Sequence, residues 1–301
     1  MSSIEILEVS PRDGLQNEAV HVSTSDKIEL IERAISAGAR RIEATSFVNP
    51  KRVPQMADAA EVMAAVPRNK GVLYSGLVIN NKGLERALES KVDQVNIIVV
   101  ASDTFCDRNQ GMTTMESIAI ATGLVKEAKS AGLFTTVTIG ATFGCPFEGE
   151  VSIERITDVI SRLVDAGPDE LTLADTIGVA VPSEIKERIA IARKIAGASM
   201  PLRLHLHDTR HTAVANAVAA LEAGVSTLDA SIGGMGGCPF APKATGNVAT
   251  EDLIYLFNRM GVSTGMTLQP VIEATEWLEG KLSKPLPGAL LRAGDFPGNL
   301  L

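Results

Sequence analysis

Residues 4–45 read IEILEVSPRDGLQNEAVHVSTSDKIELIERAISAGARRIEAT, and this stretch contains one complete strand–helix–strand unit. Residues 4–9 are mostly apolar and predict the first strand. Residues 25–37 predict a helix, because their apolar side chains recur at the spacing of one helical face. These apolar positions are Ile28, Ile31, Ala34 and Ile35. Gly38 ends the helix, and residues 41–45 predict the second strand.

The same unit repeats along the chain. Strands are predicted over residues 4–9, 41–45, 72–77, 95–100, 135–139, 171–174, 202–206 and 227–230. Helices are predicted over residues 25–37, 57–66, 82–90, 115–131, 153–166, 183–196, 213–223 and 250–260. Several of these helices end in an Ala-Gly pair, which stops a helix before the next strand. These repeated units predict an α/β protein with a closed (β/α)8 barrel, the TIM-barrel fold.

An open doubly wound sheet is the alternative fold. No G-x-G-x-x-G pattern follows the first strand, where a dinucleotide-binding sheet of that kind would carry it. One more helix is predicted over residues 271–281, and the Pro- and Gly-rich end beyond it is left without assigned structure. We expect one catalytic barrel domain over residues 1–301, in which residues from about 265 to 301 form a helical C-terminal extension.

Composition excludes several classes of function. The formal net charge is −8, and no basic cluster interrupts it, which argues against nucleic-acid binding. The N-terminus lacks a targeting pattern, and no stretch reaches the roughly 20 apolar residues that span a bilayer. The three cysteines do not form a disulfide framework, which fits a reducing compartment. We therefore expect a cytoplasmic protein without membrane or nucleic-acid partners, with Cys145 structural and Cys106 in a loop.

Unusual polar residues follow the predicted strands at their C-terminal ends. In a (β/α)8 barrel these ends meet at one mouth, where the active site lies. The residues are Arg12, Asp13, Gln16, Glu43, Asp175, Thr176, His205, His207, Asp208, Cys238 and Asn247. Residues so far apart in the sequence would therefore converge on one site.

The pair His205 and His207 is the strongest local signal for a metal site. Residues i and i+2 of a strand point to the same side, so both imidazoles can reach one ion. The alternative is a pair of hydrogen-bonded core histidines. Asp13 offers a carboxylate oxygen and Asn247 an amide oxygen, and such a set suits Mg²⁺ or Mn²⁺ better than zinc. Cys238 as a further ligand would favour zinc, but a tight ligand would immobilise a loop that is built to move.

A glycine-rich run precedes Cys238, and residues 233–239 read GGMGGCP. Glycine gives the backbone access to positive φ, and a thiol on a loop after the last strand suggests a reactive group. The alternative is a flexible turn with an incidental cysteine.

Arg12 either forms a surface ion pair or stabilises an oxyanion beside the metal. Glu43 and Asp175 either cap strand ends, orient ligands, or carry protons. His211 either reaches the mouth or lies on the surface, and His21 has no assigned role.

The chain resembles the 3-hydroxy-3-methylglutaryl-CoA lyases in order from about residue 4 to 280. The matching segments are VSPRDGLQNE (9–18), IEATSF (42–47), PQM (54–56), GCPFEG (144–149), DTIG (175–178), HLHDT (205–209), GGCPFA (236–241) and TGNVATED (245–252). The resemblance implies a TIM barrel that binds a divalent cation through four ligands, which are Asp13, His205, His207 and Asn247. It also implies catalytic roles for Arg12, Glu43, Asp175 and Cys238, with Cys238 on a loop that closes over the substrate. Arg12, Gln16 and Thr176 are the implied substrate contacts.

The implied reaction makes the protein a carbon–carbon lyase that converts an acyl-CoA to acetyl-CoA and a keto acid (acetoacetate), as in leucine degradation. A cation, Mg²⁺ or Mn²⁺, would lower the pKa of the tertiary hydroxyl group. Arg12 would stabilise the enolate of acetyl-CoA, and Cys238 or Asp175 would transfer protons. We also expect a homo-oligomer, namely a dimer.

The predicted fifth strand departs from the family. Members typically read close to Arg-Gly-Tyr-Val-Ser-Cys where this chain has Thr136-Val137-Thr138-Ile139-Gly140-Ala141, which suggests a roomier or more apolar acyl pocket. Arg210-His211 likewise replaces Tyr-Gly. The substrate could therefore be another branched 3-hydroxyacyl-CoA, of the citramalyl-CoA or isohexenylglutaryl-CoA type. A condensing enzyme or aldolase of the same superfamily, and a non-catalytic scaffold, are the alternative functions.

Overall fold

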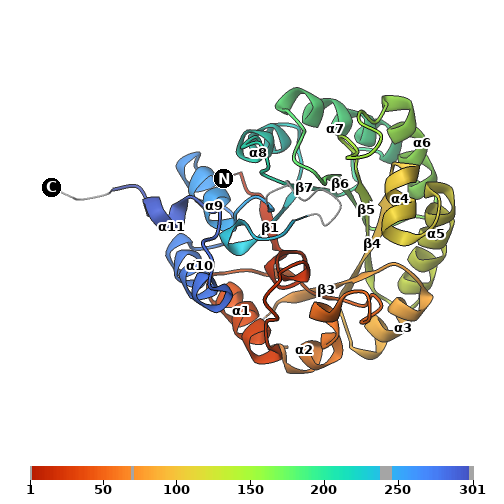
Figure 1. The fold of residues 1–301 in the computed structure, drawn as a ribbon. Helices are drawn as coiled ribbons and strands as arrows, with labels where there is room; N and C mark the ends of the chain where they lie inside the picture. The colour runs from red at the N-terminus through yellow and green to blue at the C-terminus, as the bar shows by residue number, and fades with distance from the viewer. Residues whose placement is uncertain (1, 69–70, 238–245, 298–301) are drawn as a thin grey trace.

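The structure is a computed structural model that describes residues 2–68, 71–237 and 246–297. Parallel strands form a closed barrel in the order of the sequence, and β1 pairs with both β2 and β8. The strands are β1 Glu5–Glu8, β2 Arg41–Ser46, β3 Leu73–Val78, β4 Gln94–Val100, β5 Phe134–Gly140, β6 Glu170–Asp175, β7 Leu202–Leu206 and β8 Thr227–Ala230. Figure 1 looks into this barrel and shows helices around it. The predicted (β/α)8 barrel is confirmed, and the open doubly wound sheet is wrong.

The main outer helices follow the strands in turn. They are α1 Thr24–Ser36, α2 Ala59–Ala65, α3 Asn81–Glu89, α5 Thr114–Ser130, α6 Ile153–Val164, α7 Pro182–Ala196, α8 Ala213–Glu222 and α9 Thr250–Arg259. Helix α6 shows why these segments are helical. Its buried residues Ile156, Val159, Ile160 and Leu163 recur every three or four positions and face the strands. Ser152 begins the helix by accepting a hydrogen bond from the amide of Arg155.

The structure corrects the predicted position of Cys106. This residue lies buried in α4 Asp103–Gln110, not in a loop. The helix is two turns long and buries only Phe105 and Cys106, so its sequence carries almost no apolar periodicity. The sequence did carry signals for the two ends of this helix. Ser102 caps its start, and Gly111 adopts a left-handed φ of 76° at its end. Cys145 is buried with its Sγ 2.9 Å from Ser102 Oγ, which fits the structural role predicted for it.

Two helices follow the last strand–helix unit. Helix α10 Leu268–Leu282 packs against α1 and α9, which places this late helix beside the first helix of the chain (Figure 1). The short helix α11 Leu290–Ala293 lies within the tail to which no structure was assigned. Helices formed by the described residues lack the combination of length and apolar character that a membrane span requires.

Charged and polar side chains, paired with one another, fill the barrel interior. Near the N-terminal ends of the strands, Arg41 forms two 3.0 Å contacts with the carboxylate of Glu170. Arg203 lies nearer to the mouth of the barrel, with its Nη1 3.5 Å from Glu170 Oε2. Most TIM barrels fill this space with branched apolar residues. The interior of this barrel therefore carries a chain of paired charges.

Candidate active site

Asp13 reaches the mouth of the barrel because a single tight turn follows β1. Residues Ser10–Gly14 form a short π-helix (η1), in which the carbonyl oxygen of Val9 accepts hydrogen bonds from the amides of Asp13 and Gly14. Gly14 is required here, since a Cβ at this position would lie 2.9 Å from Ser231 Oγ. A π-turn of this kind often marks a functional site.

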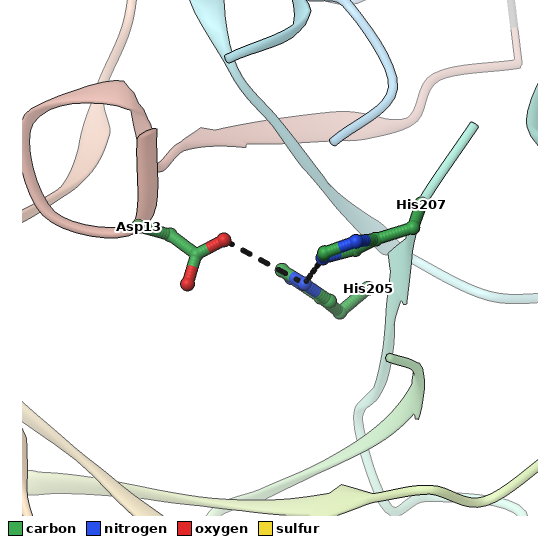
Figure 2. A group of neighbouring side chains, drawn as sticks. All are labelled: Asp13, His205 and His207. Carbon is green, nitrogen blue, oxygen red and sulfur yellow. Dashed lines mark hydrogen bonds and ion pairs between the residues drawn. The ribbon is translucent and has the colours of Figure 1, made fainter. Parts of the chain in front are cut away.

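Asp13, His205 and His207 form the cluster predicted from the sequence. Their ligand atoms all lie within 4.8 Å of one another. His205 Nε2 is 3.0 Å from His207 Nε2 and 3.9 Å from Asp13 Oδ2. Figure 2 shows the carboxylate and both rings turned toward one another. Burial would raise the pKa of Asp13, but the charges of Arg12, His205 and His207 and the hydrogen bond from Asn247 together outweigh it and hold the pKa well below its usual range.

Asn247 completes a donor set that fits a divalent cation. Its side-chain amide donates hydrogen bonds to Asp13 Oδ2 at 2.7 Å and to the carbonyl oxygen of Met235 at 2.8 Å. Its Oδ1 is buried and accepts no hydrogen bond from the residues that the structure describes. A carboxylate, two imidazoles and an amide oxygen are suitable ligands for Mg²⁺ or Mn²⁺.

Arg12 lies between two carboxylates and is only 6% exposed. Its Nη1 contacts Asp13 Oδ1 at 2.5 Å, and its Nε donates to Glu43 Oε1. Burial disfavours the charged guanidinium, yet the charges of Glu43 and Asp13 raise the pKa of Arg12. The surface ion pair considered for Arg12 is therefore wrong.

Glu43 is the third residue of β2 and faces the barrel interior, so its interpretation as a strand-end cap is wrong. Its second oxygen accepts a 2.7 Å hydrogen bond from Asn96 Nδ2, and Asn96 Oδ1 accepts one from Thr138. These hydrogen bonds link β2 to β4 and β4 to β5 inside the barrel. They fix Glu43 and, through it, the position of Arg12.

Asp175 and Thr176 lie at the end of β6, and both are engaged with the backbone. The carboxylate of Asp175 accepts hydrogen bonds from the amides of Val179 at 2.9 Å and Ala180 at 3.0 Å. This is the capping geometry that was one of the alternatives for Asp175. Burial raises the pKa of Asp175 despite these two hydrogen bonds. Thr176 Oγ1 accepts a 2.9 Å hydrogen bond from the amide of Ala141.

Gln16 lies apart from the cluster, just after η1. It lines a surface cavity of about 330 Å³ together with His21, Arg52 and other residues. His211 is a surface residue with a side chain 93% exposed. Asp208 accepts a 2.9 Å hydrogen bond from the amide of Ala213 and thereby begins α8.

The interior face of β5 carries small side chains near the mouth. Thr138 binds Asn96 and is 7% exposed. A Cβ at Gly140 would lie 3.6 Å from Thr176 Oγ1, which is ordinary van der Waals contact. The neighbouring interior residue of β4, Ile98, is half-buried and apolar. The wall made by Thr138, Gly140 and Ile98 therefore lacks charged or aromatic groups.

Two buried carboxylates that the sequence analysis missed hold the base of the glycine-rich loop. Glu8 accepts a 3.1 Å hydrogen bond from the amide of Ile232, and Glu251 accepts a 3.0 Å one from Gly233. Burial raises the pKa of both groups, that of Glu251 to about 8. The sequence signal that could have identified Glu8 is its charge within an otherwise mostly apolar first strand. Cys238, and the loop closure predicted for it, lie outside the described residues.

Gly233 and Gly236 adopt φ values of 73° and 109° on the way to Cys238. A Cβ at Gly236 would lie 2.4 Å from Asn247 Nδ2. Asn17, just after η1, donates a 2.7 Å hydrogen bond to the carbonyl oxygen of Gly237. The loop therefore leaves the barrel directly beside Asp13 and Asn247.

Comparison with known proteins points to one family. The family model described as HMGL-like matches residues 3–278. A hydroxymethylglutaryl-CoA lyase of Bacillus subtilis is 42% identical over 289 residues, which is 96% of each chain. An (R)-citramalyl-CoA lyase of Chloroflexus aurantiacus is 42% identical over 306 residues, covering 98% of this chain and 96% of that protein. A crystal structure of an Acinetobacter baumannii HMG-CoA lyase in complex with coenzyme A and 3-methylmalate superposes with a TM-score of 0.93 and 38% identity, covering 98% of this chain and 96% of that one.

Proposed function

Because this chain belongs to the HMGL-like family, we propose that it cleaves a 3-hydroxy-3-methylglutaryl-CoA-like thioester to acetyl-CoA and a keto acid, which is acetoacetate for hydroxymethylglutaryl-CoA itself. The protein is a carbon–carbon lyase of the hydroxymethylglutaryl-CoA lyase type. The observation that carries the proposal is the cluster of Asp13, His205 and His207 beside the buried Arg12. It lies at the C-terminal ends of the strands, where TIM-barrel enzymes carry out their chemistry.

We propose that Asp13, His205, His207 and Asn247 hold Mg²⁺ or Mn²⁺. When bound, such a cation lowers the pKa of the substrate hydroxyl group and neutralises negative charge on the acyl oxygens. The free Oδ1 of Asn247 and the ionised carboxylate of Asp13 support this assignment. Within this set, the side chains of Asp13, His205 and His207 are already turned toward one another.

The reaction requires one proton to leave and another to be taken up. Loss of the hydroxyl proton lets the bond between C2 and C3 break, and the hydroxyl oxygen becomes the keto oxygen. The bond's electron pair passes into the thioester and forms the enolate of acetyl-CoA. Arg12, fixed by Glu43 and Asp13, supplies positive charge to the enolate oxygen. Protonation of the enolate carbon completes acetyl-CoA.

Cys238 and Asp175 are the two candidates for proton transfer. The carboxylate of Asp175 already accepts two backbone hydrogen bonds, which orients it toward the loop after β6. Cys238 follows a run of glycines whose base lies beside Asp13 and Asn247. We therefore assign protonation of the enolate carbon to Cys238, and acceptance of the hydroxyl proton to Asp175.

The β5 wall bears on which acyl group the substrate carries. Relatives named for hydroxymethylglutaryl-CoA and for citramalyl-CoA are each 42% identical to this chain, so identity does not separate them. The side chains at Thr138 and Gly140 are small, and the neighbouring Ile98 is apolar. This wall supports citramalyl-CoA and the longer isohexenylglutaryl-CoA as alternative substrates, and Gln16 and Thr176 as contacts on the substrate's path.

A substrate panel tests the proposed function. The protein with Mg²⁺ or Mn²⁺ should release acetyl-CoA from at least one of hydroxymethylglutaryl-CoA, citramalyl-CoA and isohexenylglutaryl-CoA. Addition of EDTA should stop the release, and excess cation should restore it. If acetyl-CoA is instead only consumed, in the presence of a 2-keto acid, the protein is a condensing enzyme. If none of the thioesters changes in either direction, the proposed lyase function is wrong.

Replacement of Cys238 by alanine should separate proton transfer from cation binding. We expect kcat to fall by about 10²- to 10⁴-fold, the usual contribution of a positioned acid or base. The dissociation constant for Mn²⁺ should stay within about threefold, since the four proposed ligands remain. Cys106→Ala, which alters a buried thiol in α4, is the matched control and should keep its turnover. Equal losses of turnover and Mn²⁺ affinity in Cys238→Ala would make the thiol a ligand.

Four further features remain predictions. They are the native cation, an assembly of identical subunits as a dimer, a cytoplasmic location, and a part in leucine degradation. Light scattering, which measures the mass of the protein in solution, tests whether the protein is a dimer.

A further inference from the structure

A line of buried charges leads from the barrel interior to His205. Asp229 Oδ2 lies 3.1 Å from His205 Nδ1, and Asp229 Oδ1 lies 3.2 Å from Arg203 Nε. The side chains of Arg203, Asp229 and His205 are 1%, 5% and 11% exposed. None of the roles proposed above uses Arg203 or Asp229.

The barrel register dictates this contact. Strands β7 and β8 pair so that His205 lies directly opposite Asp229. Arg203 is two residues before His205 on β7 and therefore points to the same side. All three side chains enter the barrel interior, where Arg203 also donates a 2.8 Å hydrogen bond to Thr172 Oγ1. Arg203 is thus anchored independently of Asp229.

The carboxylate determines which ring nitrogen of His205 carries the proton. Asp229 Oδ1 is paired with Arg203, and Asp229 Oδ2 lies where it can accept a hydrogen bond from Nδ1–H of His205. Nε2 then presents its lone pair, and this is the nitrogen that faces His207 and Asp13. A neutral imidazole with a free Nε2 is the form that binds a cation.

Arg203 places a positive charge against the buried carboxylate of Asp229. The guanidinium lies between Asp229 and Glu170, and Glu170 is itself paired with Arg41. A buried charge is tolerated only when a charge of opposite sign and further hydrogen bonds compensate it. The alternation of Arg41, Glu170, Arg203 and Asp229 supplies that compensation.

We propose that Asp229 is the positioning residue for His205, fixing its Nδ1–H tautomer and ring orientation, and that Arg203 holds Asp229 in place. This inference rests on the proposed cation site. Neither residue touches the substrate in this assignment. Both act through His205, so their loss should appear first in cation affinity.

The test measures Mn²⁺ binding to the full-length protein by calorimetry, without substrate. Asp229→Ala should weaken Mn²⁺ binding by about 10- to 100-fold, the usual effect of losing such a partner. Asp229→Asn should also weaken it, because the amide can turn its N–H₂ toward Nδ1 and move the proton to Nε2. Thr227→Val is the matched control, since Thr227 is equally buried two residues earlier on β8 and does not contact His205. It should bind Mn²⁺ like the native protein.

The tautomer itself gives a second measurement that does not depend on activity. In the metal-free native protein at alkaline pH, the ¹⁵N chemical shifts of His205 should identify Nδ1 as the protonated nitrogen. A shift pattern with the proton on Nε2 would overturn the inference, even if Asp229→Ala does not fold. Native Mn²⁺ affinity in a folded Asp229→Ala would overturn it too. If the native protein cleaves its substrate but binds no Mn²⁺, the cation site and this inference fail while the lyase function stands.

Discussion

Asp13→Asn should reduce the release of acetyl-CoA by about 10³-fold or more. Loss of the cation removes several kcal/mol of charge stabilisation, and each 1.4 kcal/mol is worth about tenfold in rate. Asparagine keeps the shape of the side chain but lacks the negative charge that Asp13 brings to the two histidines. Mn²⁺ affinity and turnover should therefore fall together. Calorimetry with Mn²⁺ and an acetyl-CoA assay check the two losses in the same preparation.

Asp208→Asn is the control for Asp13→Asn. Asp208 directly follows His207 and begins α8, so its replacement removes a nearby negative charge without touching the cluster. The two variants should differ by at least about two orders of magnitude in kcat, because only one removes a proposed ligand. If Asp13→Asn retains native Mn²⁺ affinity, Asp13 is not a ligand. If kcat falls equally in both variants, the loss reflects the overall negative charge at the mouth and not a ligand role of Asp13.

The sequence predicted the barrel and its cation cluster for the same physical reason. Five of the eight predicted strands end with unusual polar residues, and closure of the barrel brings those ends together. Asp13 and the pair His205 and His207 lie almost 200 positions apart, yet one rule about parallel strands placed them within reach. The i, i+2 spacing of the histidines needed no tertiary information. These predictions depended only on strand geometry, which local sequence specifies well.

The contacts behind the cluster could not be predicted in the same way. Asp229 touches His205 because β8 pairs with β7 in one particular register, and a shift by one residue would turn it to the helices. The side chain of Glu8 points away from the barrel interior. It accepts a hydrogen bond from the amide of Ile232, which lies 224 positions later in the chain. Such partners are fixed by packing across the sheet. An acid within an apolar strand signals that a partner exists, but not which one.

Arg12→Ala should lower kcat by about 10²- to 10³-fold, the usual cost of removing one group that stabilises an oxyanion. The guanidinium is the fixed positive charge nearest to Asp13, and it is held by Glu43 from the other side. Mn²⁺ affinity should stay the same or increase, because a positive charge next to a proposed ligand is lost. This split between turnover and cation binding distinguishes Arg12 from Asp13. Steady-state kinetics and Mn²⁺ calorimetry on one preparation measure both quantities.

Arg12→Lys provides the matched comparison. The ammonium group keeps the charge but cannot contact Glu43 through one nitrogen and Asp13 through another, as the planar guanidinium does. It should therefore recover part of the turnover and leave Mn²⁺ binding near its native value. Loss of a buried ion-pair partner also destabilises the fold, by about 3–5 kcal/mol when no charge replaces it, so a melting curve accompanies each variant. A folded Arg12→Ala within about tenfold of native kcat would exclude Arg12 as the stabiliser of the enolate, because removal of that group should cost more.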